Sequence, residues 1–304
     1  MTVYAGLLAA IAASYLAFGQ PPGPQVSVLV TLEAKHGKTI PALEAPDVRV
    51  QQGKEQRPVT GLRPLRADEG RFQLMLLVDD SAQGSFDTEI DTLKKWLNTL
   101  PPNAETAVAY MRNGMADVTA NFTKDHTAAA NGIRLALGPG GADVSPYDSL
   151  TDAIKKWPGG GAERKIVVMV SSGIEALGGG YTSDNPYVNA GIRAAQTAGV
   201  TVYTIYSPSV GHAGHSMWRS SWGQNFLSQL ADETGGESYD IGFGSPVSFQ
   251  PFLDSILERF GHQYVLTFSA RPEKKAGLQP VRISIPEKDA SIAAPDKVYV
   301  PASL

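Results

Sequence analysis

The chain has 304 residues, of which 42% are hydrophobic and 18% are charged. This length and balance suit a folded protein with a sizeable core and argue against disorder along the whole chain. The net charge of −4 disfavours a nucleic acid or an anionic membrane surface as a partner, and the absence of cysteine excludes disulfides, cysteine zinc sites and thiol nucleophiles.

The first residues differ in texture from the rest. Residues 3–18 are almost wholly apolar or small and are followed by PPGP, which is typical of a signal peptide. The segment lacks an early Lys or Arg, so an uncleaved anchor or a buried helix is the alternative, but the run falls short of the roughly 20 apolar residues that a membrane span needs. We expect a signal peptide over 1–20, a protein that is secreted or held in the periplasm or cell envelope, and membrane attachment only if this segment stays uncleaved.

Residues 25–68 form a β-rich segment. Polar and apolar residues alternate over 25–32, a polar turn follows at 35–38, and short extended pieces are expected at 47–50 and 59–62. Nothing here has helical period. The segment is about forty residues long, which is too small for an independent core.

From 71 to 261 strands and helices alternate. Apolar runs predict strands at 73–78, 106–111, 165–170, 200–206 and 237–240, and a hairpin partner at 116–122. Apolar residues at helical spacing predict helices over 86–97, 126–137, 147–157, 186–198, 224–233 and 249–260. This alternation predicts an α/β fold with a doubly wound, mostly parallel, Rossmann-like sheet and helices on both faces.

The segment 262–304 returns to β texture, with strands expected at 263–269, 280–285 and 296–300. Neither β-rich flank is large enough to bury a core alone. We therefore expect 25–68 and 262–304 to pack together as one β-sandwich that carries the α/β domain as an insertion.

The strand at 73–78 runs directly into Asp79, Asp80 and Ser81. In open α/β sheets, ligands bind just beyond the carboxyl ends of the strands. Three further stretches stand at the ends of predicted elements. SPYDSL at 145–150 is a helix start, KIVVMVSSG at 165–173 is a strand with its end, and LADETGG at 230–236 is a helix end.

Together with LLVDDSAQGS at 76–85, these stretches resemble the von Willebrand factor type A family in order and spacing. More narrowly, the whole part after the leader is similar to the VWFA-related proteins described from acidobacteria, β-rich flanks included. The resemblance implies a metal-ion-dependent adhesion site. There an Asp and two Ser from the first loop, a Thr from the second and an Asp from the third hold Mg²⁺, and an open position takes a partner's carboxylate.

Two of these positions keep the family's residues, namely Asp79 and Ser81. The second Ser is replaced by Gln83, and the third-loop Asp is replaced by Ser172. Mg²⁺ prefers about six oxygen ligands in near-ideal octahedral geometry, so each loss weakens the site.

The Thr position falls on Val144, which cannot ligate a metal, although Ser145 follows directly. We therefore expect a degenerate site with no cofactor or only weakly bound Mg²⁺. Asp79 and Ser81 would then accept backbone N–H groups and cap the following helix. An occupied metal site built on the same side chains is the alternative.

Further candidates lie beside this site. Asp80 points away from Asp79 in a strand, so it should lie behind the metal shell or face solvent, where a partner could meet it. Trp218 and Trp222 are expected on a Gly-rich loop and could anchor a partner, with half-buried packing as the alternative. His212 and His215 have the spacing of a metal pair, but no third ligand is near in sequence, which favours an exposed loop.

These patterns predict a non-catalytic, exported module for protein binding or adhesion that engages an unidentified protein partner through the top of the sheet. One alternative is a structural or envelope-assembly scaffold with no ligand at the site. Another is a hydrolase acting through Asp79, Ser81 and an unassigned base, although the chain has no G-x-S-x-G or H-E-x-x-H motif.

Overall fold

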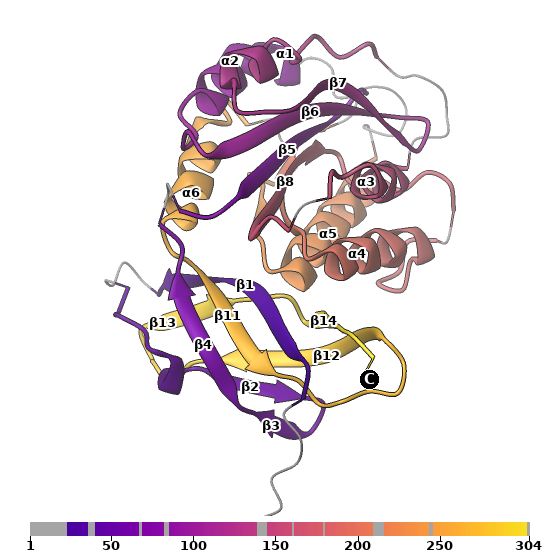
Figure 1. Ribbon diagram of the computed structural model, residues 1–304. Coiled ribbons are helices and arrows are strands. Elements are labelled where there is room, and N and C mark those ends of the chain that lie inside the picture. The colour runs from indigo at the N-terminus through magenta and orange to yellow at the C-terminus, as the bar shows by residue number, and fades with distance from the viewer. Residues whose placement is uncertain are drawn as a thin grey trace, which may run out of the picture.

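The computed structural model describes residues 23–35, 40–66, 69–81, 85–138, 145–159, 161–178, 180–208, 216–242 and 246–302. The expected signal peptide at 1–20, Gln83, Val144, His212 and His215 lie outside the described residues. Among the described helices, none is long and apolar enough to cross a membrane. Figure 1 shows an α/β half and a β half joined end to end.

The α/β half is built on a six-stranded sheet of order β10-β9-β8-β5-β6-β7. Its strands are β5 (Phe72–Asp79), β6 (Ala104–Arg112), β7 (Met115–Thr123), β8 (Arg164–Ser171), β9 (Thr201–Tyr206) and β10 (Ser238–Tyr239). All neighbours are parallel except β6 and β7, which form the predicted antiparallel hairpin. The predicted doubly wound, mostly parallel sheet is confirmed.

Helices cover both faces of this sheet, as Figure 1 shows. The alternate β5 residues Leu74 and Leu76 pack with α1 (Ser85–Leu97) and α6 (Gln250–Phe260), and α2 (His126–Ala130) lies on the same face. The residues between them pack with the helices of the opposite face, α3 (Pro146–Lys155), α4 (Pro186–Ala198) and α5 (Met217–Thr234). Because every β5 side chain is buried, an apolar run appears in the sequence instead of an alternating pattern.

Two predicted helices differ from the structure. The helix expected over 126–137 is wrong beyond Ala130, because Tyr110 holds the next backbone segment: its Oη accepts from the Arg134 N–H at 2.8 Å and donates to the Arg134 carbonyl at 2.6 Å. Helix α5 begins at Met217, not at 224, since the Ser216 hydroxyl caps it by accepting from the Arg219 N–H at 3.4 Å.

The β half contains two four-stranded sheets, with orders β13-β1-β11-β4 and β14-β12-β2-β3. Their strands are β1 (Gln25–Ala34), β2 (Arg49–Gln52), β3 (Glu55–Arg57), β4 (Val59–Pro64), β11 (Gln263–Ser269), β12 (Gly277–Ser284), β13 (Ala290–Ala293) and β14 (Lys297–Val300), with a short 3₁₀ turn, η1 (Ala45–Asp47), before β2. The two sheets share one core. Strands from the two chain ends pair directly, because β1 and β4 flank β11 and β2 pairs with β12.

The β half lies at the amino ends of the parallel strands, so the carboxyl ends point away from it (Figure 1). Buried Arg164, at the start of β8, donates to the carbonyls of Leu65 and Arg66 just after β4. Arg259 on α6 pairs with Glu33 of β1 and with Glu237 before β10. These cationic side chains fix the two halves to each other and leave the carboxyl edge of the sheet clear.

Candidate functional site

Asp79 ends β5 with its side chain only 2% exposed. One carboxylate oxygen accepts from the Ser81 N–H at 2.9 Å and from the Ser81 hydroxyl at 2.6 Å, and the other accepts from the Ser171 hydroxyl at 3.0 Å. Burial raises the pKa of Asp79, and the hydrogen bonds from Ser81 and Ser171 oppose that rise without cancelling it. The carboxylate is therefore satisfied by its own neighbours.

A second buried carboxylate, Glu175, lies in the loop after β8. It accepts from the Ser145 hydroxyl at 2.5 Å and from the Leu177 N–H at 2.7 Å, and burial raises its pKa. Ser145 is also the N-cap of α3, where its hydroxyl accepts from the Asp148 N–H at 3.1 Å. Glu175 was not among the predicted site residues, although a carboxylate just past an apolar strand end was the signal that could have revealed it.

The hydroxyl that reaches Asp79 from β8 belongs to Ser171, the residue before the candidate metal ligand Ser172. Ser172 is buried, and its hydroxyl accepts from the Ile174 N–H at 3.4 Å. Adjacent strand residues point to opposite faces, so an offset of one residue changes which serine meets the carboxylate. The structure therefore joins Asp79 with Ser81, as the sequence indicates, and adds Ser171, while Ser145 is joined to Glu175.

Asp80 is 3% exposed, so the expectation of a solvent-facing carboxylate available to a partner is wrong. Its oxygens lie 2.7 Å from the Arg134 guanidinium and 3.3 Å from that of Arg112, and the Leu137 N–H donates to it at 2.9 Å. Burial raises the pKa of Asp80, but the bonds from Arg134 and Leu137 outweigh it and the pKa is lowered overall. The Arg134 guanidinium also stacks 3.8 Å above the Tyr110 ring. Asp80 thus ties the segment after α2 to the sheet.

Trp218 and Trp222 lie in the first turns of α5, so their placement on a loop is wrong. Trp218 is 59% exposed, and its ring meets the Tyr181 ring at a centroid distance of 4.5 Å. Trp222 is half-buried and packs on Phe226 with ring centroids 5.6 Å apart. Trp218 belongs to the surface, whereas Trp222 belongs to the helix packing.

The large apolar side chains that are exposed in the described part of the chain gather at the carboxyl edge of the sheet. Of nine such residues, only Tyr299 lies in the β half. The other eight, which we name the apolar rim, lie in the α/β half, on segments that follow β6, β8, β9 and β10 or, for Leu135 and Leu137, on the segment that bonds to Asp80 after β5: Met115, Leu135, Leu137, Leu177, Met217, Trp218, Ile241 and Val247. Exposed apolar groups gathered in one region are typical of an interaction surface.

The described residues fit a divalent cation poorly. Mg²⁺ needs about six oxygen ligands, and the carboxylates of Asp79 and Glu175 already accept hydrogen bonds from their neighbours. No group of three or more His, Cys, Asp or Glu in the described ranges is placed to hold a metal. Two guanidinium groups, from Arg112 and Arg134, add positive charge at Asp80 beside this position.

No family model and no curated protein matches this chain. Among solved structures, the chain is similar to BatB from Bacteroides thetaiotaomicron at 12% identity and a TM-score of 0.45, covering 62% of this chain and 96% of that one. It is also similar to the SpRpn10 VWA domain, at 14% identity and a TM-score of 0.40, covering 61% of this chain and 95% of that one.

A third likeness spans both halves. The three N-terminal domains of the type V pili tip protein Mfa5 from Porphyromonas gingivalis match at 11% identity and a TM-score of 0.45, covering 93% of this chain and 67% of that one. With TM-scores below 0.5, none of these likenesses assigns a function to this chain.

Proposed function

We propose that this protein is an exported, non-catalytic binding module that engages a protein partner through the apolar rim, without a bound metal ion. The gathering of exposed apolar side chains at the carboxyl edge of the sheet carries this proposal. Partner recognition concentrates in exposed aromatic and aliphatic anchors, and Trp218 at 59% exposure, set against Tyr181, is the best anchor on the rim.

The hydrogen bonding at the same edge supports recognition without metal. The hydroxyls of Ser81 and Ser171 both donate to the Asp79 carboxylate, and the Ser145 hydroxyl donates to Glu175. A cation would have to displace these bonds and form new ones with only two carboxylates. The von Willebrand A resemblance and export through the leader at 1–20 belong to the same proposal.

The test compares a rim variant with a matched variant in the β half. The double substitution Leu137→Ser and Trp218→Ser removes two exposed rim side chains, and Tyr299→Ser removes the exposed apolar side chain outside the rim. Each protein is immobilised and exposed to an envelope extract of the source organism, with and without a chelator. We expect one retained protein that survives the chelator and Tyr299→Ser and falls at least about tenfold with the double substitution, since anchor truncations cost about 2 kcal/mol or more.

Equal retention by the rim double variant would overturn the proposed surface. Loss of retention in chelator, together with Mg²⁺ binding at about 1 mM or tighter that Asp79→Ala abolishes, would show a working metal site instead. Retention of nothing by any variant would favour the scaffold alternative.

A further inference from the structure

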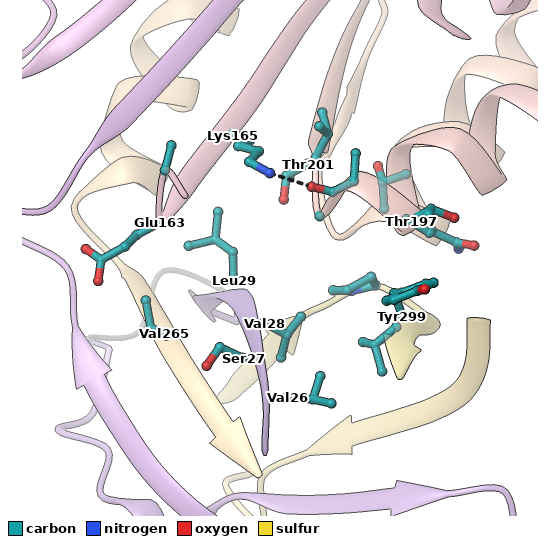
Figure 2. Close-up of a pocket in the computed structure, with 18 of the residues that line it drawn as sticks. Val26, Ser27, Val28, Leu29, Glu163, Lys165, Thr197, Thr201, Val265 and Tyr299 are labelled. Carbon is teal, nitrogen blue, oxygen red and sulfur yellow. Dashed lines mark hydrogen bonds between the residues drawn. The ribbon is translucent and has the colours of Figure 1, made fainter. Parts of the chain in front are cut away.

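A cavity lies at the amino edge of the central sheet, between the two halves. It has a volume of about 430 Å³, which is within the range of small-ligand pockets. One wall is formed by β1 and β14 of the β half, and the other by the starts of β8 and β9 with the end of α4. Figure 2 shows Lys165 and Thr201 on one side of this space and Ser27 and Val28 on the other.

Half of strand β1 presents an open edge to this cavity. β1 pairs with β11 from Gln25 to Thr31, but β13 covers its other side only from Thr31 to Ala34. The Leu32 N–H donates to the His262 carbonyl and the Lys35 N–H to the Asp289 carbonyl, so even-numbered residues bond toward β11 and odd-numbered residues toward β13. Since hydrogen-bonding direction alternates along a strand, the N–H and C=O groups of Ser27 and Leu29 point to the side where β13 has ended. No described strand pairs with β1 there.

One charged side chain that lines the cavity, Lys165, has no carboxylate partner among the described residues. Lys165 is half-buried and donates to the Ala198 carbonyl at 2.9 Å, and it pairs with no carboxylate of the described residues. An ammonium has three donors, so two remain for an occupant. The other charged groups of the lining are already paired, because Glu163 binds Arg63 and Lys297 lies 3.7 Å from both Glu233 and Asp296.

We propose that this cavity binds a short extended peptide that adds to the open edge of β1 and places a carboxylate on Lys165. Two unpaired backbone positions at a strand repeat match the groups of a peptide backbone, whereas a small organic acid would satisfy Lys165 alone. The uncovered length, from Gln25 to Val30, accommodates about four to six residues at about 3.3 Å each. Leu29 and Val200 supply apolar surface for its side chains.

Burial lowers the pKa of Lys165, and a carboxylate brought by the peptide would stabilise the charged ammonium and raise that pKa again. The site lies at the amino edge of the sheet, away from the apolar rim, so it is independent of the proposed function. Either one can fail without the other.

The probe is a library of acetylated pentapeptides with four random positions and a C-terminal Asp, whose side-chain and terminal carboxylates are both free. A matched library ends in Asn-amide. The full chain is immobilised, the enriched peptide is synthesised, and its affinity and the hydrogen exchange of backbone amides are measured. We expect enrichment from the acidic library only, with exchange at Ser27 and Leu29 slowed by the bound peptide.

Two pairs of variants locate the contacts. Ser27→Pro removes an N–H that the β1–β11 ladder does not use, so it should abolish binding and leave the fold intact, whereas Ser27→Ala keeps binding. Lys165→Met should weaken binding about tenfold through loss of a charged hydrogen bond, while the exposed Lys95→Met leaves it unchanged. Thermal unfolding confirms that each variant is folded.

Four outcomes would overturn the proposal. They are no enrichment, equal binding of the amide library, full binding by folded Ser27→Pro, and binding without protection of Ser27 and Leu29. The last would identify a small-carboxylate site in place of a peptide site, and competition by butyrate would establish it.

Discussion

The two edges of the central sheet differ in how far their polar groups are already hydrogen-bonded within the protein. At the carboxyl edge, Asp79, Asp80 and Glu175 are buried and fully engaged by nearby hydroxyl, guanidinium and N–H groups. At the amino edge, the backbone groups of Ser27 and Leu29 that face away from β11 pair with no strand of the described residues, and Lys165 donates to the Ala198 carbonyl but to no described carboxylate. A polar group that is already satisfied has little to offer a ligand. Under our two proposals, recognition at the carboxyl edge would therefore use apolar side chains, and polar recognition would take place at the amino edge.

Removing the anion that organises the carboxyl edge should have the largest effect. Asp80→Ala removes the buried carboxylate that pairs with Arg134 and Arg112 and takes an acceptor from the Leu137 N–H, so we expect the free energy of unfolding to fall by about 3 kcal/mol. Asp117→Ala is the matched control, because Asp117 is exposed and lies 3.8 Å from Arg134, farther than Asp80 does. This substitution should lower the free energy of unfolding by less than about 0.5 kcal/mol. Urea unfolding measures both. Equal losses would mean that Asp80 does not organise this edge.

A smaller loss is expected where the two halves join. Arg259→Met deprives Glu33 and Glu237 of their common partner, and since both carboxylates are partly exposed, the cost should be about 1–2 kcal/mol. Arg66→Met breaks an exposed pair with Glu69 and should change stability by less than about 0.5 kcal/mol. Both are read from denaturant midpoints, and a cost for Arg259→Met no greater than that for Arg66→Met would refute the joining role.

The two tryptophans of α5 separate packing from recognition. Trp222→Ala removes a half-buried ring from Phe226 and should cost about 2 kcal/mol. Trp218→Ala removes an exposed ring and should cost about 0.5 kcal/mol in thermal unfolding. If Trp218→Ala proves as destabilising as Trp222→Ala, Trp218 serves the fold and cannot be read as a free anchor of the rim.

Local pattern in the sequence was sufficient for the fold. Strand β5 is covered on both faces, so its burial appears as an unbroken apolar run, and α3 and α4 begin at capping side chains that precede a proline. The alternation of strands and helices predicted the doubly wound, mostly parallel sheet, and the helix expected after β7 is wrong beyond Ala130, where the Tyr110 hydroxyl bonds to the backbone of Arg134.

The site depended on contacts that local pattern does not encode. Arg134 meets Asp80 across 54 positions of sequence, and nothing near Asp80 announces a guanidinium. The sequence did not single out Ser171 as the partner of Asp79, because an unbroken apolar run does not reveal which side chains of a strand face a neighbouring strand end. Residue types at the strand ends could therefore be predicted, whereas their partners could not.

The smallest effect is a contrast in pH dependence between the adjacent carboxylates. The folded pKa of Asp79 is raised above 3.8, so its protonated form favours folding, and that contribution is present at low pH and lost as pH rises through the folded pKa. The folded pKa of Asp80 is lowered below 3.8, so its contribution is present at higher pH and lost as pH falls through that pKa.

The free energy of unfolding is measured at about pH 4 and about pH 7. Asp79→Asn should remove the part of the wild-type stability that is lost between these pH values as Asp79 ionises. Asp80→Asn should lower the free energy of unfolding more at about pH 7 than at about pH 4. The side-chain amide introduced by Asp79→Asn would still accept from Ser81, so the fold is kept in the first variant. An unchanged profile in Asp79→Asn would mean that this carboxylate is ionised without penalty. In that case the carboxyl edge would hold a charge free to recruit a cation, and the contrast between the two edges would disappear.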